Sequence, residues 1–459
     1  MGIKRAVLSA VVALSASAFV AQADTLADAM AGAYGHSGLI DQNRALLRAA
    51  DEDVAQATAS LRPILNWSAG VTNNFTIDPS NASTTSASAG LDLSWVLIDN
   101  GSRKLNKARL EQTVLATRQG LVSVEQRVLL SAVQAFMNVR RDARIVSLRQ
   151  NNLRVITREL RAAEDRFEVG EVTRTDVALA QARLAGARAE LAVAQGNLMA
   201  SQASYEAAVG RKPQTLSQPT RLPRAAKSLD AAQAIAVRTH PDMLAAQFRV
   251  AAADIGANAA QTALRPDVNL NVGLTQSHTF DTDTNSLGGR VSITTGGPIY
   301  QGGAIASLSR QAIARRDAEK ARLHATRHNI RLSVGNAWAQ LLAARAQREA
   351  SRRQIEAAQV AFDGVREEAS LGSRTTLDVL NAEQELLDAK ANEISAQSAE
   401  FTAAYSLLAS MGLLTVDNLN LAVEKYDPEA YYNQVKNAPA MKSKQGQQLE
   451  KILRRIENQ

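Results

Sequence analysis

The chain repeats one pattern of residues at a spacing of about 202 positions, which limits its fold to one built from two similar halves. Four landmarks recur in register, more than chance supplies. They are Leu-Arg-Pro at residues 61–63 and 264–266, a turn glycine at Gly170 and Gly372, Asp-Val at residues 176–177 and 378–379, and a helix-ending glycine at Gly210 and Gly412. We expect a first structural repeat over residues 24–228 and a second over residues 229–425. A belt-like segment over residues 426–459 should follow and become a disordered, polar tail from Lys436.

Each half contains two segments in which apolar and polar residues alternate, the pattern of a β-strand with two different faces. These segments span residues 65–77, 86–97, 268–275 and 290–294. Taken alone, they also fit a soluble sheet with one wet face. Four strands cannot close a barrel, however, and the rest of the sequence offers no second sheet to cover them.

The strand lengths match the roughly 9–11 tilted residues with which a strand crosses an outer membrane. We therefore expect a membrane barrel that is shared between protomers. In this arrangement the residues that face lipid include Trp67, Val71, Leu93 and Leu270, and those that face the lumen include Asn66, Thr72, Asp92 and Asn269.

Two long stretches without proline follow the strand pairs, at residues 101–170 and 303–371. At 1.5 Å per residue, each helix would be about 100 Å long. Apolar residues at 3–4 spacing in the first stretch predict a coiled-coil seam, and abundant alanine favours packing on both flanks over a two-stranded rod. The seam positions are Leu121, Val124, Val128, Ala132, Ala135, Val139, Ala143, Val146, Leu153, Ile156, Leu160 and Phe167. Returning helices are expected at residues 173–209 and 375–411.

The N-terminus has the order of features of a secretory signal peptide. Lys4 and Arg5 precede an apolar run at residues 6–20, and Ala-Gln-Ala follows at residues 21–23. The run is shorter than the roughly 20 residues of a membrane-spanning helix, and no later stretch has 18 consecutive apolar residues. We expect residues 1–23 to be removed on export and any membrane crossing to use β-strands. Without cysteine, the chain also lacks the residue to which a lipoprotein anchor is attached.

Composition and the few candidate site residues argue against nucleic-acid binding and against catalysis. The formal net charge is +7, the two signs are interleaved, and only 4% of the residues are aromatic. His324 and His328 have the i, i+4 spacing of a metal pair, but the glutamate of a zinc-protease motif is missing, which favours a surface pair. The glycines at residues 296–303 lack the lysine of a phosphate-binding loop. We expect no enzyme activity, no metal and no cofactor.

Three short segments resemble motifs of the TolC family of outer-membrane proteins. They are residues 166–177, which begin Arg-Phe-Glu-Val-Gly, residues 297–303, which read Gly-Pro-Ile-Tyr-Gln-Gly-Gly, and residues 371–380, which begin Leu-Gly-Ser-Arg-Thr. Each motif alone is weak, but their order and spacing match over almost the whole mature chain. The resemblance implies an α+β membrane protein in which four transmembrane strands per protomer contribute to a trimeric, twelve-stranded barrel. A long periplasmic α-helical coiled-coil barrel would continue it.

The resemblance also implies a function in the cell outer membrane, with a large periplasmic portion. The homotrimer would be a passive exit duct for efflux or type I protein secretion. It would work with a periplasmic adaptor and an inner-membrane ABC or RND transporter, surrounded by outer-membrane lipid. The alternative is a structural periplasmic coiled-coil protein, such as an adaptor itself, but we find no lipoyl-like or small β-barrel module.

The gate of the family can be carried over to four residues of this chain. The resemblance implies that Arg374 ties the inner helix pair to Thr175 and Asp176 of the outer pair, and that a ring of Asp378 carboxylates lines the entrance and collects cations. Two positions that bear on the strength of the closed latch depart from the family pattern. Ala369 replaces a tyrosine that bonds the outer aspartate, and Asn381 replaces a second ring aspartate.

The same residues also fit a purely local role. Thr173 with Asp176, and Thr375 with Asp378, have the spacing of a helix capping box after a helix-ending glycine. Capping and a place in the ring are compatible for Asp378. A further pair, Glu159 and Arg366, aligns with another family latch but has changed residue types.

Overall fold

The computed structural model describes residues 23–77, 83–224, 226–262 and 265–457. Residues 1–22 of the predicted signal peptide, residues 78–82 between the first two predicted strands, and Leu264 of the second Leu-Arg-Pro landmark lie outside the described residues. The elements in chain order are α1 (Leu26–His36), α2 (Gly38–Ala59), β1 (Ile64–Phe75), β2 (Ser83–Ile98), α3 (Ser102–Glu168), α4 (Arg174–Val209), α5 (Leu229–Thr239), α6 (Pro241–Thr262), β3 (Asp267–Thr279), β4 (Thr284–Gly296), α7 (Ala304–Ser370), α8 (Thr376–Ser410), α9 (Val416–Leu419), α10 (Pro428–Val435) and α11 (Lys444–Glu457).

The two halves of the chain carry the same elements in the same order, so the internal repeat is confirmed. Each half has an 11-residue helix, a 22-residue helix, two strands, a 67-residue helix and a long returning helix. Both 67-residue helices begin after a glycine with φ of +85°, Gly101 and Gly303, a conformation that glycine adopts without a steric penalty. The long helices therefore begin and end within about two residues of the positions expected from the sequence.

The four strands form one antiparallel sheet in the order β1-β2-β3-β4. Residues directly opposite one another in neighbouring strands share a face of the sheet. The register pairs residues of the predicted apolar face with each other. Trp67 lies opposite Leu91, and Leu93 lies opposite both Leu65 and Val272. The predicted alternation is therefore confirmed, and one face of the sheet is apolar.

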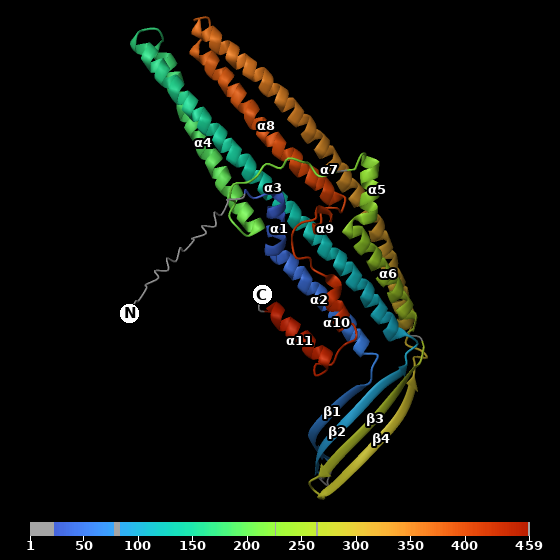
Figure 1. Cartoon of the computed structure of the whole chain (residues 1–459). Helices are drawn as coiled ribbons and strands as arrows, with labels where there is room; N and C mark the ends of the chain where they lie inside the picture. The colour runs from blue at the N-terminus through green and yellow to red at the C-terminus, as the bar shows by residue number, and fades with distance from the viewer. Residues whose placement is uncertain (1–22, 78–82, 225, 263–264, 458–459) are drawn as a thin grey trace, which may run out of the picture.

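In the part of the chain that the structure describes, no helix covers this sheet, which lies at one end of the molecule beyond the helices (Figure 1). Its apolar side chains are exposed in the single chain: Trp67 is 78% exposed, Val71 70% and Val291 73%. A soluble sheet would bury such a face against another layer. The exposed face therefore needs an apolar environment that the single chain does not supply.

The helices form two long hairpins, α3 with α4 and α7 with α8, whose ends lie at the opposite end of the molecule from the sheet (Figure 1). The main core lies partway along them, where α1 packs against α3 and α5 packs against α7. Phe136 of α3 and Tyr205 of α4 are fully buried in this core. The hairpins are thus held together near their middle, and their ends extend away from the core.

Two glycines at the ends of the returning helices repeat one packing contact in the two halves. A Cβ on Gly210 would lie 2.3 Å from the ring of His36, and a Cβ on Gly412 would lie 2.6 Å from the Cα of His240. Both glycines have positive φ angles, +83° and +76°. Glycine is therefore required at both positions, for its conformation and for close approach to the break between α1 and α2 in the first half and between α5 and α6 in the second.

The predicted seam of α3 is confirmed for most positions, and Val128, Ala132, Val139 and Ile156 are buried. Ala143 is exposed, and its neighbour Asp142 is buried instead. Phe167 is 45% exposed because it lies in the last turn of α3, next to the loop.

In the first half, α1 and α2 are separated at Ser37, whose φ and ψ of −72° and 106° are extended. Two local features differ from the sequence-based expectation. The hairpin of β3 and β4 is longer than expected, because Thr284 and Ser286, which lie between the two predicted strands, pair with β3. In the tail expected to be disordered from Lys436, residues Lys444–Glu457 form α11, where apolar residues at 3–4 spacing give the helix one apolar face.

Candidate functional site at the hairpin ends

The start of α8 is fixed by a capping box that uses one of the predicted ring residues. Asp378 Oδ2 accepts hydrogen bonds from the backbone nitrogen and the hydroxyl of Thr375, at 3.0 and 2.8 Å. The backbone nitrogen of Asp378 donates to the Thr375 hydroxyl in return. These bonds, the backbone bond first, lower the pKa of Asp378 from its usual value, so the group is ionised at neutral pH.

The start of α4 repeats this arrangement with Thr173 and Asp176. Asp176 Oδ2 accepts from the Thr173 backbone nitrogen at 2.9 Å and from its hydroxyl at 2.7 Å. The side-chain bond from Thr173 is the main reason why the pKa of Asp176 is lowered. Both capping boxes expected from the sequence are therefore confirmed, and each leaves the second carboxylate oxygen, Oδ1, outside the box.

Arg374 and the residues predicted as its latch partners are not brought together within one chain. Arg374 Nε donates to Glu368 Oε2 at 2.8 Å, inside its own hairpin end. Thr175 is exposed on the first turn of α4. Among the described residues, none of the hydrogen bonds and ion pairs joins Arg374 to Thr175 or Asp176, and the two hairpin ends stand apart (Figure 1). The latch stays a prediction.

Within one chain, the hairpins are joined by residues that the sequence did not single out as a set. Arg183 of α4 donates to the side-chain oxygen of Asn381 of α8 at 2.6 Å. Beside this bond, Ile156, Leu184 and Leu380 form a small buried apolar cluster from α3, α4 and α8. The apolar spacing of α3 pointed to Ile156, but the partners on the other helices depend on how the hairpins pack.

A second connection lies farther from the ends. Arg149 of α3 forms ion pairs with Glu190 of α4 at 2.6 Å and with Asp388 of α8 at 3.7 Å. One arginine thus contacts both returning helices. Its ion pairs therefore connect α3, α4 and α8.

Glu159 and Arg366, the other predicted latch pair, do not form an ion pair with each other within 4 Å among the described residues. Both act electrostatically on a third residue, Glu383 of α8. Burial, and then Glu159, raise the pKa of Glu383 to about 7, and Arg366 partly opposes the shift.

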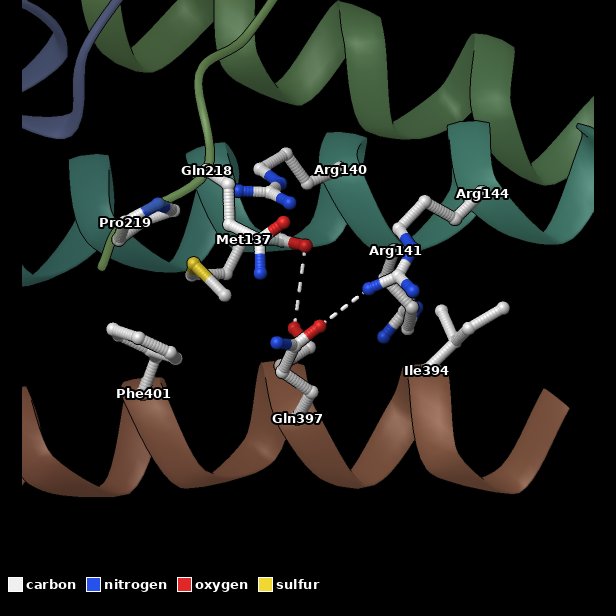
Figure 2. Close-up of a pocket in the computed structure, with 10 residues that line it drawn as sticks. Met137, Arg140, Arg141, Arg144, Gln218, Pro219, Ile394, Gln397 and Phe401 are labelled. Carbon is white, nitrogen blue, oxygen red and sulfur yellow. Dashed lines mark hydrogen bonds between the residues drawn. The ribbon is translucent and has the colours of Figure 1, made fainter. Parts of the chain in front are cut away.

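A small cavity near the core is an interhelical contact and not a ligand site. Figure 2 shows Arg140, Arg141 and Arg144 of α3 around it, with Gln397 of α8 opposite them. Arg144 donates to Gln397, and Arg140 donates to the Ser217 carbonyl oxygen at 2.8 Å. The cavity volume of about 10 Å³ leaves room for about one water molecule.

The described chain has no group of three or more histidine, aspartate or glutamate side chains placed to hold a metal ion. His324 and His328 lie exposed on α7. Among the described helices, none combines the length and the apolar composition needed to cross a membrane.

Comparison with known proteins identifies the family. The model of a family described as outer membrane efflux protein matches residues 33–211 and 225–413, which is most of the chain. The chain belongs to this family. It is therefore an outer-membrane efflux protein of the TolC type, in a family of transport proteins, and the family membership favours this function over the structural adaptor considered above.

Individual relatives agree over nearly the full length. The outer membrane efflux protein BepC of Brucella suis biovar 1 is 35% identical over 439 residues, which cover 94% of this chain and 95% of BepC. The outer membrane protein TolC of Vibrio cholerae is 25% identical over 399 residues, with 80% and 86% covered. The CmeC outer membrane channel of Campylobacter jejuni has the same fold, with a TM-score of 0.76 at 17% identity over 91% of this chain and 90% of that one. The predicted α+β fold is confirmed.

Proposed function

We propose that three copies of this outer-membrane efflux protein assemble into one passive exit duct. In this proposal a shared barrel crosses the outer membrane, and the helical hairpins continue it as a tunnel in the periplasm. A periplasmic adaptor and an inner-membrane ABC or RND transporter would supply the connection and the energy. Efflux is the transport that the family description names, and type I protein secretion is the second use to which the TolC resemblance points.

The observation that carries the proposal is the open sheet. With the order β1-β2-β3-β4, the outer edges of β1 and β4 have no partner strand in the described chain. An unpaired edge readily pairs with another chain, and a four-stranded sheet is too narrow to close on itself. Three sheets joined edge to edge make twelve strands, and the closed barrel would turn its exposed apolar face to lipid.

Cross-linking tests this assembly, and the absence of native cysteine makes introduced cysteines unambiguous. One cysteine replaces Thr72 on β1 and another replaces Ser292 on β4, and a flexible bis-maleimide is added to outer-membrane vesicles. We expect covalent dimers and trimers and no larger species. The control is a cysteine pair at Ser94 and Asn271, which lie opposite each other within one chain and should leave monomers. Monomers alone from the edge pair, or a ladder beyond trimer, would exclude the closed trimer.

We further propose that the hairpin ends form the gate of this duct. Arg374 of one chain would reach Thr175 and Asp176 of the next, in competition with its present partner Glu368. Removal of its charge should loosen the closed state in three places, so Arg374→Ser should raise conductance in planar bilayers. Arg174→Ser, at the end of the other hairpin, is the control and should conduct like the parent. Equal conductance of Arg374→Ser and the parent would reduce Arg374 to a surface loop residue.

A further inference from the structure

Glu383 occupies a position on α8 where the helix pattern calls for an apolar residue. Leu380 precedes it by three positions and Leu387 follows by four, and both are buried, with exposures of 2% and 6%. This i, i+3, i+7 spacing places all three residues on the face of α8 that packs against other helices. Glu383 thus places a carboxylate in an interhelical seam.

The carboxylate of Glu383 is poorly satisfied there. Its Oε2 atom is buried and has no hydrogen-bond partner among the described residues. A buried polar atom without a partner opposes packing, and more so when it carries a charge. The unpartnered oxygen therefore makes the packing of α8 at this level sensitive to whether the carboxylate carries a proton.

The groups that face Glu383 come from both 67-residue helices. Glu159 of α3 repels the ionised form and Arg366 of α7 attracts it. On α4, Arg183 is already engaged by Asn381, two residues before Glu383. Two carboxylates therefore share one arginine. When both are ionised, the cluster carries an uncompensated negative charge at the junction of the hairpins.

We propose that Glu383 is a proton-controlled clasp between the two hairpins: its neutral form lets α8 pack against α3 and α7, and its ionised form loosens them. Glu383 acts through helix packing, so it is a positioning residue and not part of the conducting path. Its position behind the hairpin ends means that loosening would widen the gate.

The direction of the pH dependence follows from burial. The packed hairpins hold the pKa of Glu383 at about 7, whereas a loosened, hydrated Glu383 would return to its ordinary value of 4.5. Between these values the packed state binds a proton that the loosened state does not. Packing is therefore strongest at the acidic end of this range. As the pH rises from about 4.5 to about 7, the equilibrium constant for packing falls by up to about tenfold per pH unit in each chain. Above about pH 7 the packing equilibrium no longer changes with pH through Glu383.

Two measurements test the clasp. Hydrogen exchange of residues 376–390 in the purified full-length protein, corrected for the intrinsic pH dependence of exchange, should show protection that falls as the pH rises from 5 to 7.5. Conductance in planar bilayers should rise over the same interval. The conductance measurement depends on the proposed duct and the exchange measurement does not, so failure of the duct and failure of the clasp can be told apart.

Three variants complete the design. Glu383→Gln mimics the neutral carboxyl and should keep high protection and low conductance at both pH values. Glu159→Gln removes the repelling charge and should move the midpoint to lower pH. Glu385→Gln, exposed on the same helix, should behave like the parent. Asp378 does not interfere, because its pKa is lowered and it titrates below this window.

The clasp is overturned if protection in the parent is constant between pH 5 and 7.5 or rises with pH. It is also overturned if Glu383→Gln keeps the pH dependence of the parent, or if Glu385→Gln abolishes it equally.

Discussion

The hydrogen bond between Arg183 and Asn381 should contribute measurably to the closed state of the duct. It joins α4 to α8 over 2.6 Å at an exposed position. A solvated hydrogen bond contributes about 0.5–1.5 kcal/mol, and we take about 1 kcal/mol for each chain. If a trimer opens by releasing all three bonds, their loss favours opening by about 3 kcal/mol, or roughly a hundredfold in the ratio of open to closed states.

A double-mutant cycle isolates this contribution. The open probability in planar bilayers is measured for Arg183→Ala, for Asn381→Ala and for the combined variant. We expect each single substitution to raise the ratio of open to closed states by up to about a hundredfold, and the combined substitution to raise it little further. Arg188→Ala, an exposed arginine on the same helix, is the control and should leave the open probability unchanged.

Additivity would refute the reasoning. If the combined variant shows the sum of the two single effects, the residues act independently and the bond does not hold the hairpins. A fourth variant gives an independent check: Asn381→Asp offers Arg183 a charged acceptor, and charge-assisted bonds are the stronger ones. It should lower the open probability below that of the parent.

Three further predictions concern other parts of the molecule. A trivalent cation added on the periplasmic side should block current in the parent but not in Asp378→Asn, and equal block of both would mean that Asp378 only caps its helix. Gly412→Ala should lower the free energy of unfolding by about 1–3 kcal/mol more than Gly372→Ala, as measured by chemical denaturation. Both glycines have positive φ, but a Cβ on Gly412 would lie 2.6 Å from a backbone atom, whereas Gly372 has open space within 4 Å. A water-restricted thiol reagent should label a cysteine at Thr72 in open trimers much faster than one at Val71, and equal rates would contradict the assigned faces of β1.

Most of the fold could be predicted because it depends on signals that act between neighbours in the chain. A long run without proline permits a 67-residue helix, and a glycine with positive φ sets where it begins. Threonine and aspartate three positions apart define a helix start, and alternation defines a strand. A weak signal was missed, because the polar residues at the turn of β3 and β4 resemble a loop as much as a strand.

In the candidate site too, local features followed from the sequence, whereas contacts between the hairpins did not. The sequence alone determined that the residues around Asp176 and Asp378 start helices, and that these helices follow tight turns, because the capping bonds are only three residues long. Only the tertiary structure decided the partners across the hairpins. Arg183 and Asn381 are 198 positions apart, and their contact depends on how two helical hairpins lie side by side.

The tertiary structure also decided which charges matter. In the sequence, the spacing of Glu383 from Leu380 and Leu387 sets it apart from the exposed Glu385, but it does not reveal which charges face it. Packing buries one oxygen of Glu383 and brings Glu159 and Arg366 to it from two other helices. Burial and the field of distant charges are properties of the assembled helices, whereas helix and strand periodicity are properties of the chain itself.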